Sequence, residues 1–323
     1  MSSVARPLAG LLCLPLLTGC TQPRASAAAD TGPCKRAAHV ADLPSVLHES
    51  SGLAASRRHP GIVWTHNDSG DAPVVYALDT SGRLVGRVRV TGAAALDWED
   101  IALGPCASGD CLYIGDIGDN DAVRGEVQVY RVPEPEPGDA DTRPAERLTL
   151  TYPGGPRDAE ALYVLPDTGI YIVSKGRREP VALYRVPRGW QPAASARLEH
   201  VQTLAPRASG PDEMVTGADA TPDGSWVTIR TYAWLRFYRP GADGRLTPAF
   251  QGLGAPLEDA GEPQGEAVAF GRGDTIWLSS EAGPGGGRAA FDRIGCALPG
   301  RGGKGEPTGA GGAPAGPAST TGG

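Results

Sequence analysis

The chain of 323 residues carries 30 basic and 37 acidic side chains, which gives a formal net charge of −7 at pH 7. This mildly acidic balance argues against nucleic-acid binding, which depends on a basic stripe. Asn occurs only twice and Lys only three times, so the positions of these rare residues are informative.

The N-terminus has the features of an export signal. Arg6 precedes the apolar run 8–17, which is too short to span a bilayer. The run ends in Leu17-Thr18-Gly19-Cys20, which resembles a bacterial lipobox. We therefore expect a signal peptide at 1–19, lipidation of Cys20, and a flexible tether over 20–33. The chain would then be secreted and held by its lipid on the extracytoplasmic face of the cell membrane. An ordinary secretory signal with a chance cysteine is the alternative.

Four cysteines remain in the predicted mature domain, and export places them where disulfides persist. Cys106 and Cys111 have the spacing to clamp a hairpin, and Cys34 and Cys296 lie at the two ends of the foldable region. We predict the disulfides Cys34–Cys296 and Cys106–Cys111. Zinc is the competing use, but neither a paired CxxC nor an HxxxH accompanies these cysteines.

Between residues 34 and 298 the sequence shows short runs rich in Val, Ile, Tyr and Trp, separated by Gly, Pro and Asp turns, which are typical of strands. Five similar units follow one another. Each begins with a polar residue two positions before an aliphatic or small one: Ser51, Glu99, Glu160, Thr216 and Glu266. An aromatic follows in a second strand: Trp64, Tyr113, Tyr171, Trp226 and Trp277. Fourth strands are expected near 84–90, 148–152, 198–204 and 246–251.

This repeat predicts an all-β fold, a single β-propeller with five four-stranded blades. The fifth unit lacks a fourth strand, because the chain becomes a Gly/Pro-rich tail over 299–323 that cannot bury a core. The run 37–43 can fill that position and close the ring, which also brings Cys34 near Cys296. A β-sandwich, or a sixth blade within 127–157, remains an alternative.

In such blades the first strand starts, and the second strand ends, at the same face. We therefore expect a ligand site at one mouth of the central channel. Its predicted ligand-binding residues are His66, Asn67, Asp68, Asp97, Glu99, Asp116, Glu160, Lys175, Arg230, Glu266 and Glu281. Asn and Asp before Gly also favour tight turns, which is an equally good explanation for Asn120 and Asp71.

Three glutamates close together would repel one another unless a cation lies between them. Lys175 and Arg230 could neutralise them in a fixed ion network. Otherwise a hard divalent cation, with Ca²⁺ favoured, could be held by carboxylate oxygens. The predicted metal ligands are Glu99, Asp116, Glu160 and Glu266.

The units resemble those of the NHL, SMP-30/gluconolactonase and phytase-like esterase propellers, with "GADATPDG" at 217 the closest match. The resemblance covers about 34–296 and lies in the shared pattern of the blades. It implies a divalent cation in the channel held by Glu, Asn and Asp, and hydrolysis of lactones or phosphoesters. Residues of the matching types here are Glu99, Glu160, Glu266, Asn67, Asp68 and Asp116.

Two functions follow from these features. The first is a membrane-tethered, monomeric propeller that binds a small polar ligand or a partner protein at its acidic mouth. The alternative is a metal-dependent hydrolase with Glu160, Lys175 and Arg230 as the candidate catalytic residues. A quinone-dependent sugar dehydrogenase has only His66 and Arg230 in its favour. The sequence contains no GxSxG, HExxH or P-loop motif.

Overall fold

The computed structural model describes residues 33–167, 169–252, 254–257 and 260–301. The predicted signal peptide, Cys20, the tether up to residue 32 and the tail beyond residue 301 lie outside the described residues. Within the described part, regular structure is β-strand apart from two short 3₁₀ turns at Pro211–Glu213 and Phe250–Gly252. No helix among these residues has the length and apolar character needed to cross a membrane.

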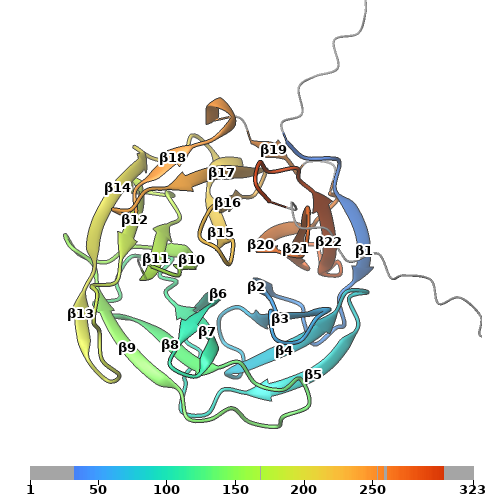
Figure 1. The fold of residues 1–323 in the computed structure, drawn as a ribbon, viewed down its shortest axis with the longest axis horizontal. Coiled ribbons are helices and arrows are strands. Elements are labelled where there is room, and N and C mark those ends of the chain that lie inside the picture. Colours follow the sequence, from blue (N-terminus) through green and yellow to red (C-terminus); the bar gives the residue numbers. More distant parts are fainter. Residues whose placement is uncertain (1–32, 168, 253, 258–259, 302–323) are drawn as a thin grey trace, which may run out of the picture. The chain divides into compact units, whose positions relative to one another are not determined.

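Five antiparallel sheets surround one axis, so the prediction of a five-bladed β-propeller is confirmed (Figure 1). Blade one comprises β2 (Ser50–Ala55), β3 (Ile62–Asn67), β4 (Val74–Asp79) and β5 (Leu84–Arg89). Blade two comprises β6 (Trp98–Cys106), β7 (Gly109–Asp116), β8 (Val127–Pro133) and β9 (Glu146–Thr151). Blade three comprises β10 (Ala159–Leu165), β11 (Gly169–Ser174), β12 (Val181–Arg185) and β14 (Glu199–Ala205). Blade four comprises β15 (Val215–Ala220), β16 (Val227–Thr231), β17 (Trp234–Pro240) and β18 (Leu246–Pro248).

Blade five closes the ring as expected. It comprises β20 (Gln264–Phe270), β21 (Thr275–Glu281), β22 (Ala290–Gly295) and the N-terminal strand β1 (Ala38–Asp42). β1 pairs antiparallel with β22, and the predicted Cys34–Cys296 disulfide joins the two chain segments next to this pair. The second predicted disulfide, Cys106–Cys111, spans the β6–β7 hairpin.

Two edge strands differ from the expectation. The fourth strand of blade four ends at Pro248, because Phe250 and Gln251 adopt positive φ and form a 3₁₀ turn; the short β19 (Ala255–Pro256) then pairs with the other end of β17. The connection after β12 also forms β13 (Ser195–Arg197), which pairs in parallel with β9 of blade two. The stretch 127–157 contains β8 and β9, so it holds no sixth blade.

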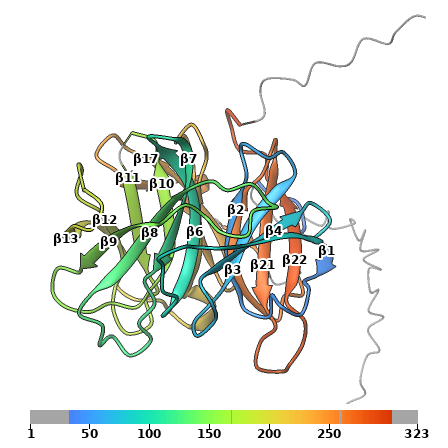
Figure 2. The ribbon, with the colours of Figure 1, turned by 90° about the horizontal axis from the view of Figure 1, so that it is seen from below.

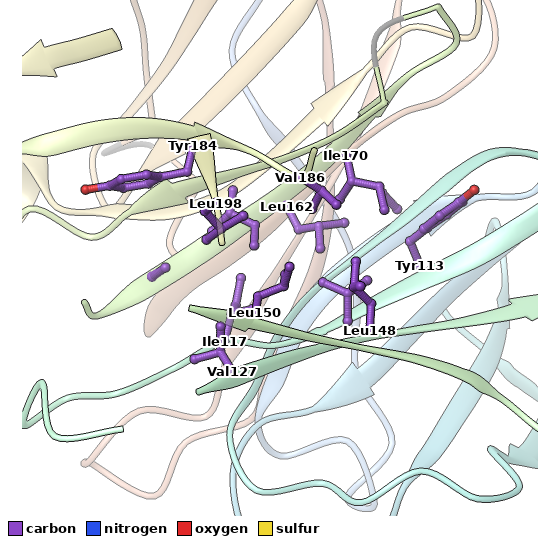
Figure 3. Close-up of a cluster of buried hydrophobic side chains, with 14 of the residues drawn as sticks. Tyr113, Ile117, Val127, Leu148, Leu150, Leu162, Ile170, Tyr184, Val186 and Leu198 are labelled. Carbon is purple, nitrogen blue, oxygen red and sulfur yellow. The ribbon is translucent and has the colours of Figure 1, made fainter. Parts of the chain in front are cut away.

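The hydrophobic core lies between neighbouring blades. The cluster between blades two and three contains Tyr113 and Leu148 from blade two and Leu162 and Tyr184 from blade three (Figure 3). Both faces of each sheet pack against a neighbouring blade, so successive residues of a strand are buried on alternate faces. This explains why the strands are nearly continuous hydrophobic runs. This burial is the main force that holds each blade against the next.

Each of the five inner strands carries a β-bulge at the same position. The register shifts by one residue between Ser50 and Gly52 in β2, and the other inner strands shift at the equivalent place. The five residues left out of the ladders are Ser51, Glu99, Glu160, Thr216 and Glu266. A bulge redirects the side chain of its extra residue. These are the same five positions that define the sequence repeat.

Buried polar groups also connect the inner strands. The carboxylate of Asp100 accepts hydrogen bonds from the backbone N–H groups of Leu162 (2.8 Å) and Ala218 (3.1 Å), so it links blade two to blades three and four. The hydroxyl of Thr216 donates to the carbonyl of Glu266 at 2.9 Å, and that of Ser51 donates to the carbonyl of Glu99 at 2.7 Å. These bonds connect the inner strands of different blades; β2 and β6, which the Ser51 bond joins, lie side by side in Figures 1 and 2.

We predict that the two disulfides stabilise the fold unequally. Replacing Cys34 and Cys296 together by Ser should lower the free energy of unfolding by about 5 kcal/mol, because this bond closes a sequence separation of 262 residues. The control pair, Cys106→Ser with Cys111→Ser, opens a separation of 5 and should cost about 2 kcal/mol. Denaturant unfolding measures both, and an equal or larger loss from the control pair would contradict the prediction.

Candidate functional site

Side chains from all five blades converge at the channel mouth where the inner strands begin. One ring consists of the bulged residues, of which Glu99, Glu160 and Glu266 are acidic. In each blade, the residue before the bulge pairs with a residue near the end of the second strand. The residue that follows this partner belongs to a second ring: Asp68, Ile117, Lys175, Tyr232 and Glu281. We call the charged and polar members of these rings, with Asp97 and Gln264 beside them, the acidic mouth.

Lys175 is the only cationic side chain in these two rings. Its ammonium group donates to Glu160 at 2.5 Å, and both side chains are buried. Burial alone would lower the pKa of Lys175, but the carboxylates of Glu160 and Glu99 outweigh it and raise that pKa. Lys175 therefore stays charged at any physiological pH and neutralises one carboxylate of the mouth.

Asp68, Asp97 and Glu99 form the densest group of carboxylates. One oxygen from each lies within 4.8 Å of those of the other two. The backbone of Gly118 packs directly on this group: a Cβ atom at Gly118 would lie 2.1 Å from Oε1 of Glu99 and 2.6 Å from Cγ of Asp97. Any larger residue at 118 would displace the carboxylates. We call these three residues the carboxylate triad.

The acids of the mouth bind protons more tightly than usual. Burial, together with the charges of Glu160 and Asp97, raises the pKa of Asp68 to about 8. Burial, with Glu49 and Glu160, raises the pKa of Glu281 to about 7. The pKa of Glu99 is also raised, by burial and by Glu160. Lys175 therefore offsets only part of the negative charge of the mouth.

Blade five contributes a hydrogen-bonded pair of acids. The amide of Gln264 donates to Oε1 of Glu266 at 2.8 Å and to Oε2 of Glu281 at 2.7 Å. The other oxygen of Glu266 is buried and has no hydrogen-bond partner. Burial, Glu160 and Glu281 raise the pKa of Glu266 well above its usual value.

Four predicted site residues lie outside the mouth and have structural partners: His66, Asn67, Asp116 and Arg230. Asn67 braces its turn by donating to the carbonyl of Val46 (2.8 Å) and to Asp71 (2.5 Å). His66 is fully buried with its ring edge-on to Trp98, and burial lowers its pKa to about 4, so it is neutral. Nδ1 of His66 is 2.9 Å from the carbonyl of Asn67 and donates to it.

Asp116, predicted as a metal ligand, is bound by other groups. Its carboxylate accepts from Arg124 at 2.8 Å and from the backbone N–H of Asp97 at 3.2 Å. Asp116 is fully buried, and it directly precedes Ile117, the second-ring residue of blade two. The structure therefore gives Asp116 a supporting role: it holds the loop that presents Asp97 rather than facing the mouth itself.

Arg230 is also placed away from the mouth, which corrects its assignment to the acidic network. Its guanidinium is fully buried between blades four and five, where it pairs with Glu262 at 2.5 Å. It also donates to the carbonyls of Ala267 (2.7 Å) and Ser279 (3.2 Å). Arg230 lies two residues before the ring position in β16, so its side chain links blades instead of lining the channel.

Tyr232 and Gly118 were not among the site residues predicted from the sequence. Tyr232 occupies the blade-four position equivalent to Lys175, and burial and Glu266 raise its pKa. Tyr232 follows its second-strand aromatic, Trp226, by six positions, whereas the offset is four in the other blades, so its equivalence to Lys175 is visible only in the strand register. Gly118, in the "DIGD" stretch, could be interpreted only as a turn residue.

Comparisons with known proteins yield fold neighbours and no family. No protein-family model matches the chain, and no curated protein matches it in sequence. The PQQ-bound aldose sugar dehydrogenase of Streptomyces coelicolor is 13% identical, with a TM-score of 0.46 over 80% of this chain and 98% of that one. A gluconolactonase of Xanthomonas campestris is 16% identical, with a TM-score of 0.43 over 77% and 72%. The apo aldose sugar dehydrogenase of Escherichia coli is 11% identical, with a TM-score of 0.45 over 81% and 99%.

We predict that the stability of the chelator-treated protein falls as the pH rises through the range set by Glu281. A carboxyl with a raised pKa keeps its proton in the folded state after the unfolded chain has lost it, so the free energy of unfolding decreases between about pH 4.5 and pH 7. Glu281→Gln should therefore stabilise the protein at pH 8 by roughly 1–2 kcal/mol and have little effect at pH 4.

Urea unfolding at both pH values measures this effect. Glu126→Gln, which removes an exposed acid from the β7–β8 connection, is the matched control and should change neither value. A stabilisation by Glu281→Gln that is the same at pH 4 and pH 8 would show that the ionisation of Glu281 does not cause it.

Proposed function

We propose that the acidic mouth binds a hard divalent cation at the carboxylate triad and, next to it, a small polar ligand. The observation that carries the proposal is the spacing of the triad. Calcium–oxygen distances of about 2.3–2.6 Å allow ligand oxygens on opposite sides of an ion to be about 5 Å apart. The triad oxygens, within 4.8 Å of one another, meet this condition. Carboxylate oxygens also suit Ca²⁺ better than they suit zinc or copper.

The charge of the mouth supports the same proposal. Six carboxyl groups share one lysine, and the raised pKa values of Asp68 and Glu281 express the repulsion among them and their burial. The unpartnered buried oxygen of Glu266 is a further acceptor that no group of the described chain satisfies. A cation or a ligand with donor groups would relieve both conditions.

The setting of this site is extracytoplasmic in the proposal. The two disulfides are typical of proteins that fold in an oxidising compartment. Attachment to the membrane through Cys20 and a monomeric state complete the proposal, and the ligand is a small molecule or a partner protein rather than a nucleic acid. Acylation of Cys20 is tested by mass spectrometry of the membrane-extracted protein.

A metal-assisted hydrolase is the second candidate, and one observation favours it. Burial, Glu49 and Glu160 raise the pKa of Glu281, which lies outside the triad, to about 7, a value that suits general acid–base catalysis near neutral pH. Lys175 could stabilise a developing anion, and its partner Glu160 could act as a general base. The quinone-dependent dehydrogenase has less support, because His66 and Arg230, its two indications, are bound elsewhere.

We predict that Ca²⁺ binds to the purified protein and that the triad carries the affinity. Asp97→Asn and Glu99→Gln should each weaken binding at least tenfold, because each removes one charged ligand. Gly118→Ala should weaken it to a similar degree although it removes no carboxylate, since its Cβ occupies the space of Glu99 and Asp97. Affinity should increase with pH from 6 to 8.5, because bound protons must leave first.

Isothermal titration calorimetry measures these affinities, with Glu126→Gln as the control that should stay within twofold of the wild type. Absence of Ca²⁺ binding at pH 8.5, or unchanged affinity in Gly118→Ala and both carboxylate variants, would contradict the proposal. Turnover of lactones, phosphoesters or acyl esters in a metal-supplemented screen, lost in Lys175→Met, would distinguish the hydrolase from a binding protein.

A further inference from the structure

A second cavity opens at the opposite end of the channel. It has a volume of about 380 Å³ and lies where the inner strands end, between blade one and blades four and five. Ala55 of β2, Leu103 of β6, Ala220 of β15 and Phe270 of β20 line it. We call it the lower cavity. Each of these residues lies several positions along its strand from the acidic mouth, so the two sites are about 10 Å or more apart.

The walls of the lower cavity combine apolar surface with two guanidinium groups. Phe270 and Trp277 form an aromatic part of the wall. Arg57 is held at the rim by bonds to the carbonyl of Leu103 (3.1 Å) and to Asp110 (3.2 Å). Arg272 is exposed. A planar guanidinium fork matches carboxylate and phosphate groups better than it matches neutral ligands.

The one carboxylate that lines the cavity is already bonded. The two oxygens of Asp219 accept the backbone N–H groups of Ala220 (2.8 Å) and Phe270 (2.7 Å), and the residue is 8% exposed. A third guanidinium, that of Arg301, lies 4.5 Å from the centre of the Phe270 ring and donates to the carbonyls of Gly271 and Thr275. Both of those residues line the cavity. Arg57 is paired with Asp110, so the exposed Arg272 is the rim guanidinium that no described carboxylate pairs with.

We propose that the lower cavity binds a small organic anion, with its carboxylate or phosphate at Arg57 and Arg272 and its apolar body against Phe270 and Trp277. The two ends of the channel then take ligands of opposite charge. Asp100 lies between the two ends of the channel, where its carboxylate accepts the backbone N–H groups of Leu162 and Ala218. The inference does not depend on the cation proposed for the acidic mouth.

Calorimetric titration with phenyl phosphate, benzoate and the neutral benzyl alcohol tests this inference. The two anions should bind saturably, with benzyl alcohol at least tenfold weaker. Arg272→Glu should weaken anion binding at least tenfold and leave Ca²⁺ binding at the acidic mouth unchanged. The matched control is Arg188→Glu, since Arg188 is exposed on the same end of the molecule but lines a different depression, beside Leu165.

The comparison of phenyl phosphate with benzoate shows which oxyanion the site prefers, and either preference supports the proposal. Binding that falls steeply with added salt also supports it, because Arg272 is exposed to solvent. Three results would overturn it: no binding of either anion, equal affinity for benzyl alcohol, or equal weakening by Arg188→Glu and Arg272→Glu. Because Arg272 is exposed, loss of folding does not obscure the outcome, and a thermal melt of the variant verifies this.

Discussion

The β-bulge at the start of every inner strand is the feature on which the candidate site depends. A regular strand would direct alternate side chains to its two neighbouring blades, and none would be free to face the channel. One extra residue per strand breaks this alternation at the mouth. Glu99, Glu160 and Glu266 are therefore left out of the pairing between the first and second strands of their blades. The core residues beyond each bulge keep their packing between blades. The fold can therefore carry a charged mouth without placing charges in its hydrophobic layers.

The position after each bulge limits what the channel can hold. This position holds a small residue in blades one, three, four and five: Gly52, Ala161, Gly217 and Ala267. In blade two it holds Asp100. Close packing explains the small residues: a Cβ at Gly52 would lie 2.6 Å from the backbone nitrogen of Ile101. One larger side chain fits only because the others are small. Since both oxygens of Asp100 accept backbone N–H groups, its carboxyl fills the axis as part of the scaffold.

The sequence was sufficient to predict the blade count, the closing strand and both disulfides, because each rests on a repeat or on the position of a cysteine. The sequence also identified the ring of bulged residues, because Glu99, Glu160 and Glu266 each stand two positions before an aliphatic residue. The second ring was predicted less well. Asp68, Lys175 and Glu281 were included, but Asp116 and Arg230 lie one and two positions too early.

In four blades the second-ring residue follows the second-strand aromatic by four positions, but in blade four Tyr232 follows Trp226 by six, so a fixed offset does not place the ring there. In blade two the offset of four gives the apolar Ile117, and the acid before it, Asp116, was predicted instead. Only the hydrogen-bonded register shows which residue is next to the bulge. The rarity of Lys and Asn in this composition was informative for Lys175, which lies in the mouth. It was misleading for Asn67, because selection for a turn brace and selection for a ligand both preserve a rare residue.

The charges of the acidic mouth favour a ligand site over a purely structural ion network. Two unit charges 4 Å apart attract by about 4 kcal/mol at an effective dielectric constant of 20, and the burial of Lys175 and Glu160 offsets part of this attraction. A purely structural network would add a second cation for the triad, as the fold does elsewhere when Arg124 meets Asp116 and Arg230 meets Glu262. Asp68, Asp97 and Glu99 have no such partner among the described residues and adopt raised pKa values instead. The chain thus pairs Asp116 and Glu262 with arginines but gives the triad no cation of its own among the described residues, so a cationic ligand at the channel mouth would complete the structure.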